Sequence, residues 1–150
     1  MSTAGRPWLF DTNVYVATMR EGLGGRTFAR LTASAPRTFL SSVVSAELQA
    51  GARDAVGRRA VLQLTRRFAR LGRIVVPTAA SWDAAGDVMA LILRRDPGLR
   101  AKVRGLWNDV LIALSARQIG ATLVTADAED YTLLRRHLRF SLEVVPPAAN

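Results

Sequence analysis

The chain contains no cysteine and only one histidine, His137. The lack of cysteine excludes disulfides, thiolate metal sites and thiol nucleophiles, and it favours a cytoplasmic protein. One histidine also excludes chemistry that needs two imidazoles. A triad of serine, histidine and aspartate stays formally open, but the chain has no Gly-x-Ser-x-Gly motif, and His137 stands among arginines in an expected exposed helix.

Acidic residues are scarce. Twelve of them stand against twenty-one lysines and arginines, which gives a net charge of +9 at pH 7. Such an excess favours an anionic partner. All the bases but Lys102 are arginines, a bias that a GC-rich genome would also produce. Because arginine runs are usually solvated helix faces, they indicate a nucleic-acid surface only where they lie beside a functional site.

Long apolar runs are also missing. No run reaches the roughly 18 residues of a membrane span, and no apolar segment typical of a secretory signal precedes the first expected strand. We therefore expect no membrane association. With 150 residues, 49% of them hydrophobic, the chain is large enough for one domain with its own core. We predict a single domain over 1–150, with tails at about 1–6 and 146–150.

Short apolar runs alternate with amphipathic segments along the chain. This alternation predicts an α/β fold, a three-layer α/β/α domain whose mainly parallel sheet has four to five short strands. The segment around Lys102 is expected to be a solvated loop. Strands are expected over 8–10, 37–40, 73–76, 122–125 and 141–145. Helices are expected over 14–19, 27–34, 43–50, 54–71, 82–94, 109–119 and 128–137, with Ser41 or Ser42, Ser81 and Asn108 among their N-caps.

Four acids stand directly after an expected strand or in the first turns of an expected helix: Asp11, Glu47, Asp109 and Asp127. In an open α/β sheet, residues just beyond the carboxyl ends of the strands line the ligand crevice. Carboxylates gathered there repel one another unless they share a cation. Mg²⁺ prefers oxygen ligands, and two ions about 4 Å apart promote hydrolysis of a phosphodiester. Each acid alone could be an ordinary cap or first-turn residue, so the set of four carries the prediction.

The motifs around these acids resemble the PIN domain, and more narrowly the VapC-type toxin ribonucleases of toxin–antitoxin pairs. The resemblance is carried by Asp11-Thr-Asn13, Ser45-Ala-Glu47, Asn108-Asp109 and Gly120–Asp127, and it spans nearly the whole chain. It implies a Mg²⁺- or Mn²⁺-dependent endoribonuclease that cuts structured RNA. It further implies inhibition by a cognate antitoxin protein, and a homodimer.

The resemblance also assigns roles to residues. Asp130, next to Tyr131, matches a position where such proteins often have another acid, so Asp127, Asp130 or both complete the metal site. Asp127 is favoured because it is closer to the strand end. The catalytic, metal-binding residues implied are Asp11, Glu47, Asp109 and Asp127, and the supporting or substrate-contacting residues are Asn13, Thr125 and Asn108.

Other interpretations stay open. The fold could serve as a non-catalytic RNA-binding module, as a DNA nuclease or as an RNA-processing enzyme outside any toxin pair. A phosphatase is disfavoured because Asn13 stands where an Asp-x-Asp nucleophile motif would need a second aspartate. Trp107 could stack on a base, although a buried aromatic at a helix start is more common. Lys102, Arg100 and Arg104 are candidate phosphate contacts.

Overall fold

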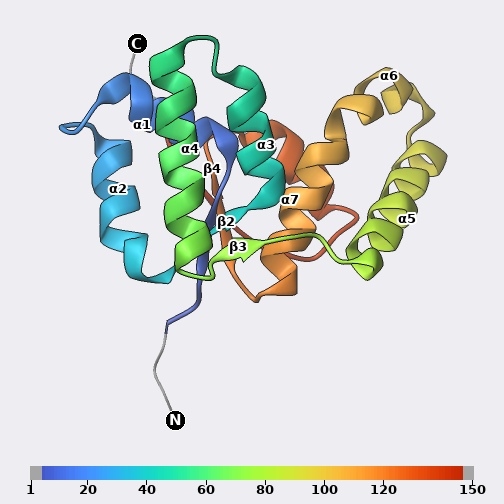
Figure 1. Ribbon diagram of the computed structural model, residues 1–150. Coiled ribbons are helices and arrows are strands. Elements are labelled where there is room, and N and C mark those ends of the chain that lie inside the picture. Colours follow the sequence, from blue (N-terminus) through green and yellow to red (C-terminus); the bar gives the residue numbers. More distant parts are fainter. Residues whose placement is uncertain (1–4, 147–150) are drawn as a thin grey trace.

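Five short strands form one parallel sheet in the order β3-β2-β1-β4-β5 (Figure 1). The structure, a computed structural model, describes residues 5–146. The predicted tails at about 1–6 and 146–150 therefore fall mostly outside the described residues. The strands are β1 (Trp8–Phe10), β2 (Thr38–Ser41), β3 (Ile74–Val75), β4 (Thr122–Thr125) and β5 (Ser141–Val144). The predicted parallel sheet of short strands is confirmed.

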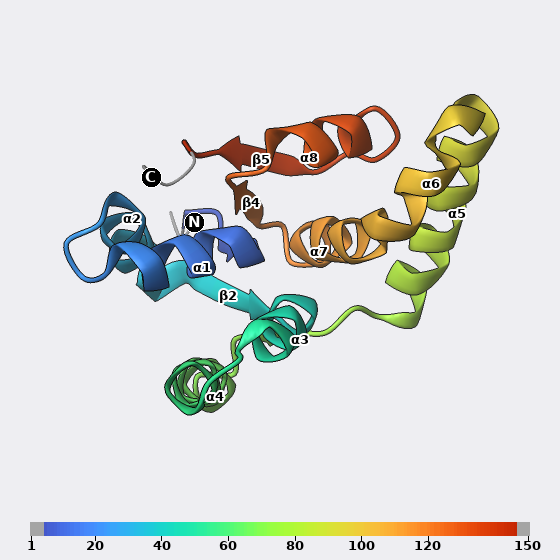
Figure 2. The ribbon, with the colours of Figure 1, turned by 90° about the horizontal axis from the view of Figure 1, so that it is seen from above.

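Helices cover both faces of this sheet. Seen from above, α1 and α2 lie on one side and α7 on the other, with α5 and α6 outside α7 (Figure 2). This arrangement confirms the three-layer α/β/α prediction. The helices are α1 (Thr12–Glu21), α2 (Arg26–Ser34), α3 (Ser42–Gly51), α4 (Ala55–Arg70), α5 (Ala79–Arg95), α6 (Arg100–Val103), α7 (Trp107–Gln118) and α8 (Ala128–Arg135), with 3-10 turns at Ala35–Arg37, Pro97–Leu99 and Arg104–Leu106. No helix within residues 5–146 has the length and apolar character to cross a membrane.

The strand order reverses next to β1. From β1 the chain builds outward through β2 and β3, then returns to place β4 on the other side of β1. Phe10 pairs with Val124, and the next amide, that of Asp11, donates to the Val124 carbonyl over 2.9 Å. Ligand crevices in open α/β sheets form at such a reversal, beyond the carboxyl ends of the strands. Asp11 and Thr125 therefore meet at the expected place for a site.

Helix α7 is the most deeply buried helix. Seven consecutive residues, 110–116, are all buried, because α7 contacts β4 on one side and α5, α3 and α8 around it. Its one polar residue in that run, Ser115, donates its hydroxyl to the Leu111 carbonyl over 2.8 Å, so no buried hydroxyl lacks a partner there. A helix held on all sides fixes the position of Asp109 in its first turn.

Two predicted helix caps are wrong. Asn108 does not cap α7, because that helix begins at Trp107 and is preceded directly by a helical turn. Ser81 does not cap α5. The cap is Thr78, whose hydroxyl accepts from the Ser81 amide over 3.1 Å. The Ser41 cap is confirmed, since its side chain accepts from Val43.

The expected loop around Lys102 is also wrong. Residues 97–106 form successive helical turns, Pro97–Leu99, α6 and Arg104–Leu106, that run directly into α7. Buried Val103 and Leu106 hold this segment against the protein. Pro97-Gly98 concealed this arrangement, because the two residues usually mark a turn rather than the start of helical structure. His137 likewise lies beyond the end of α8 and is partly buried, not in an exposed helix.

Candidate metal-dependent active site

Asp11 and Thr125 form the centre of the site. Asp11 is 5% exposed and caps α1, where its Oδ1 accepts from the Thr12 amide over 2.8 Å. Its Oδ2 accepts from the Thr125 hydroxyl, also over 2.8 Å. Burial raises the pKa of Asp11, with Glu47 adding repulsion, and the bonds from Thr125 and Thr12 lower it. The net direction is upward, so burial disfavours the charged form of Asp11 and a nearby cation would favour it.

Asn13, just after β1, binds the end of β4. Its amide nitrogen donates to the Thr125 hydroxyl oxygen over 3.2 Å, and its oxygen accepts from the Ala126 amide over 3.1 Å. The same Thr125 oxygen accepts from the Asp127 amide over 3.0 Å. Asn13 and Thr125 thus contact the backbone and the Asp11 carboxylate around the reversal point, and their supporting role in a metal site stays a prediction.

Glu47 reaches the site from α3. Its Oε1 accepts from the Thr12 hydroxyl over 2.7 Å, and its Oε2 accepts from the Asn108 side-chain amide over 3.2 Å. Asn108, expected to cap a helix, instead holds the second oxygen of this glutamate. Three elements, α1, α3 and α7, are thereby connected through one carboxylate.

Asp109 is affected by the negative charges of the other four acids. Burial and then the negative charges of Asp11, Asp130, Glu47 and Asp127 raise the pKa of Asp109 to about 7. The four other acids thus all act on Asp109. Clustered carboxylates with such a shift characterise functional sites more often than structural ones.

Tyr131 lies beneath these acids. It is fully buried, and its hydroxyl donates to Oδ1 of Asp109 over 3.4 Å, a long contact. Burial, followed by the charges of Asp11 and Asp109, raises the pKa of this phenol. The phenol therefore stays protonated and available as a donor to the carboxylates.

The first turn of α8 supplies the remaining acids. Asp127 caps this helix, with its Oδ1 accepting from the amides of Glu129 and Asp130 over 3.1 and 3.4 Å. Asp130 forms an ion pair with Lys102 over 3.0 Å. Both acids act on Asp109, and Asp130 does so more strongly than Asp127. Their contacts differ: Asp127 binds the backbone of its own helix, and Asp130 binds a cation.

The chemistry of the donors fits a hard divalent cation. The side chains are all oxygen donors, and the mutual repulsion expressed in the pKa of Asp109 is what a shared cation relieves. Within residues 5–146, no three of the acids already converge as a metal-ligand set. Their oxygens are instead engaged by neighbouring threonine, asparagine and lysine donors.

Three contributors to the site were not predicted as such from the sequence: Thr12, Tyr131 and the ion pair of Lys102. Tyr131 had one usable signal, its place four residues after Asp127 at a helix start, which brings it over the strand end. Trp107 was expected to be buried but is 38% exposed. It stands one residue before Asn108, so the interpretation as a base-stacking residue gains support.

One cavity lies outside this site. Its volume is about 450 Å³, and it is lined by residues of α1, α2 and the turn between them together with Val145 and Pro146. None of the five acids lines it. The candidate site is thus defined by its carboxylates, beyond the carboxyl ends of the strands, and not by this cavity.

Residues 8–135 match the PIN domain family. The match spans most of the chain and includes all five acids, so the chain belongs to the PIN domain family. This confirms the family resemblance carried by the acidic motifs. No curated protein matches the chain.

Solved structures similar to this chain have the same fold. VapBC2 from Rickettsia felis, bound to a DNA fragment from its promoter, is 24% identical with a TM-score of 0.65 over 92% of this chain and 98% of that one. DNA-bound VapBC from Salmonella typhimurium is 19% identical with a TM-score of 0.67, over 93% and 98%. FitAcB from Neisseria gonorrhoeae is 23% identical with a TM-score of 0.61, over 90% and 95%.

Proposed function

We propose that this protein is a Mg²⁺- or Mn²⁺-dependent endoribonuclease and the toxin of a toxin–antitoxin pair. The observation that carries the proposal is that Asp11, Glu47 and Asp109 come from three separate elements to the reversal point of the sheet, where the charges of Asp11 and Glu47 help to raise the pKa of Asp109. Membership of the PIN family supports nuclease chemistry at this place.

Asp11, Glu47 and Asp109 would hold the principal ion, with Asp127 and Asp130 on the α8 side. When bound, a divalent ion supplies electrostatic stabilisation of phosphate oxygens and an activated water for hydrolysis. Thr125 and Thr12 orient the Asp11 and Glu47 carboxylates through their hydroxyls. Asn108 donates to the other oxygen of Glu47. Neighbouring side chains therefore hold these carboxylates in position before substrate binds.

The charge of the chain suits a polyanionic substrate. With a net charge of +9 at pH 7, RNA would be attracted to the protein even though the site itself is acidic. Trp107, exposed beside Asn108, offers an aromatic face for an unpaired base. The choice of RNA over DNA follows from the resemblance to VapC-type toxins.

An antitoxin partner follows from the similarity to VapBC and FitAcB structures, and a homodimer from the family resemblance. We place the pair in the cytoplasm, where such a toxin would meet RNA. Co-expression with a short adjacent reading frame should yield a complex without nuclease activity. Light scattering should give the free toxin a mass of about twice 16.3 kDa. A mass of one chain would reject the homodimer and leave the rest of the proposal unchanged.

The test of the activity is cleavage of total cellular RNA by the purified protein with Mg²⁺, with Mn²⁺ and with EDTA, beside Asp109→Asn. We expect discrete fragments with either ion, none with EDTA and none with the variant. Circular dichroism verifies that the variant is folded. RNA binding without cleavage under every condition, by folded protein free of antitoxin, would reject the nuclease and support the non-catalytic RNA-binding alternative.

A further inference from the structure

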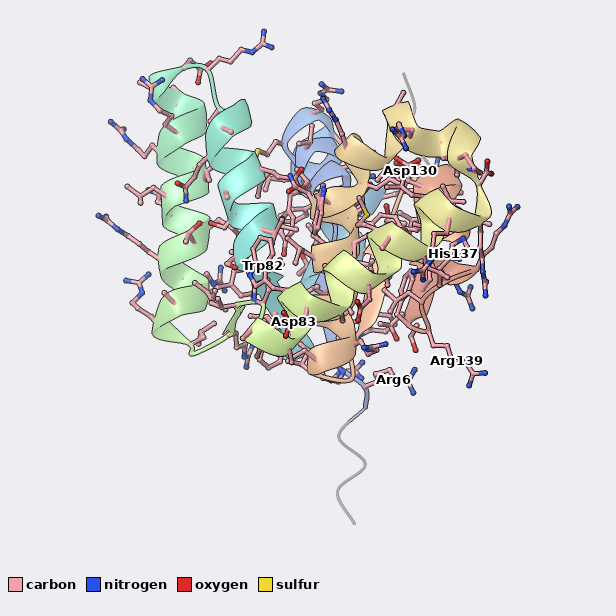
Figure 3. The ribbon with its side chains drawn as sticks, turned by 90° about the vertical axis from the view of Figure 1, so that its right-hand side faces the viewer. Arg6, Trp82, Asp83, Asp130, His137 and Arg139 are labelled. Atoms are coloured by element: carbon pink, nitrogen blue, oxygen red, sulfur yellow. The ribbon has the colours of Figure 1, made fainter. Side chains whose placement is uncertain are left out.

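The only lysine of the chain lies at the acidic edge of the site. The Lys102 ammonium is 3.0 Å from Oδ1 of Asp130 and 2.8 Å from Oε1 of Glu129. Figure 3 labels Asp130, which projects from α8 toward α6, where Lys102 stands. Over residues 5–146, Lys102 is the only base that forms an ion pair with any of the five site acids. The site therefore contains one cation of its own.

The choice of lysine at this position is informative. The other twenty bases of the chain are arginines, so the single lysine is also the one base that forms an ion pair with a site acid. An ammonium is a compact point charge with three donors, whereas a guanidinium is a broad planar fork. Among side chains, lysine is thus the closest substitute for a small hydrated cation.

Lys102 and Asp130 both belong to helices, which fix the positions of their backbones. Lys102 belongs to α6, and the next residue of that helix, Val103, is buried. Asp130 lies in the first turn of α8, whose backbone is capped by Asp127. The Lys102 and Asp130 side chains are 36% and 26% exposed, so the pair is partly shielded from water. Shielding strengthens an ion pair relative to one in open solvent.

Resting on the proposed function, we propose that the Lys102 ammonium replaces a second divalent ion at the α8 side of the site. Asp130 is neutralised by Lys102, and a fixed positive charge repels any divalent ion that approaches from that side. The protein then binds one divalent ion, through Asp11, Glu47 and Asp109. Two-ion catalysis, by contrast, needs carboxylates free on both sides.

Calorimetric titration of the full chain with Mn²⁺, without RNA, tests this inference. We expect about one Mn²⁺ per wild-type chain and about two per Lys102→Met chain, because removing the ammonium frees Asp130. Combining Lys102→Met with Asp130→Asn should return the count to about one. Arg94→Met is the matched control: it removes one positive charge from an exposed position on α5 and should leave one ion bound.

Two Mn²⁺ ions on the wild type, or one ion of unchanged affinity on Lys102→Met, would overturn the inference. Circular dichroism verifies folding, and Lys102→Gln replaces the methionine variant if that variant is unfolded. Failure of the proposed function gives a different result. In that case the wild type binds no Mn²⁺, or Asp109→Asn leaves the affinity for Mn²⁺ unchanged. Either result would be independent of the residue at position 102.

Discussion

The Thr125 hydroxyl donates to the Asp11 carboxylate over 2.8 Å, joining the ends of β1 and β4 where the strand order reverses. Thr125 is fully buried and Asp11 nearly so. The same threonine oxygen accepts from Asn13 and from the Asp127 amide. One hydroxyl therefore sets the positions of a buried carboxylate, an amide side chain and the entry to α8, and its loss should affect both folding and function.

Thr125→Ala should lower the free energy of unfolding by about 1–3 kcal/mol, because a buried carboxylate and the Asp127 amide lose their partner. Urea denaturation measures the change. Thr125→Ser keeps the hydroxyl and should recover most of the stability, losing only the packing of a methyl group. Equal stability of the alanine variant and the wild type would mean that this hydrogen bond contributes nothing to the fold.

Asp11→Asn should abolish RNA cleavage and growth inhibition while leaving the protein folded. Asparagine keeps an oxygen acceptor for the Thr12 amide but removes the charge that would hold the ion. We expect a loss of roughly 10³-fold or more, since metal-ion stabilisation accounts for several kcal/mol of the barrier. Gel-based cleavage assays measure it. Asp83→Asn, at an exposed position of α5 (Figure 3), is the control and should retain activity. Retained cleavage in Asp11→Asn would remove the metal-site assignment.

Without divalent ions, stability should fall as the pH rises from about 5 to 8. The pKa of Asp109 is about 7 in the folded protein and 3.8 for an ordinary aspartate, with burial and then Asp11 as the main causes. The folded state therefore binds this proton more tightly than the unfolded chain. The resulting stability is present at low pH and is lost as the pH rises through 7.

Thermal melting in EDTA across this range measures the effect, and Asp109→Asn, which cannot ionise, should flatten the profile. Adding Mn²⁺ at pH 8 should raise the melting temperature of the wild type more than that of the variant, because an ion that binds the folded state stabilises it. Parallel pH profiles for the two proteins would contradict the assignment of this titration to Asp109.

The sequence was sufficient to predict the sheet and where the acids stand relative to its strands and helices, since both follow from local pattern. Apolar runs placed the strands, and Asp11, Asp109 and Asp127 follow strands or begin helices within a residue or two of the expected positions. Helix ends were less predictable. Asn108 has a typical capping side chain, but the helical turn before it leaves no free N-terminus to cap.

Contacts between distant segments could not be predicted from these patterns. Thr12 binds Glu47 thirty-five positions away, and Lys102 binds Asp130 across two helices. No local pattern encodes such pairs, because they depend on how α1, α3, α6 and α8 pack. The exposure of Trp107 has the same origin: Leu106 fills the buried position at the start of α7, and the adjacent indole is directed outward.

Trp107→Ala should weaken binding of single-stranded RNA by about 1–3 kcal/mol, the usual contribution of stacking one base on an aromatic ring. Fluorescence anisotropy in EDTA measures binding without cleavage. Trp107→Phe keeps an aromatic face and should retain most of the affinity.

Trp82→Ala is the matched control, because Trp82 is 53% exposed on α5 (Figure 3) and is not adjacent in sequence to a site residue. Equal losses from Trp107→Ala and Trp82→Ala would show a general effect of removing a surface aromatic. A loss confined to Trp107→Ala, with the salt dependence of binding unchanged, would assign stacking to position 107 and leave phosphate contacts to the arginines.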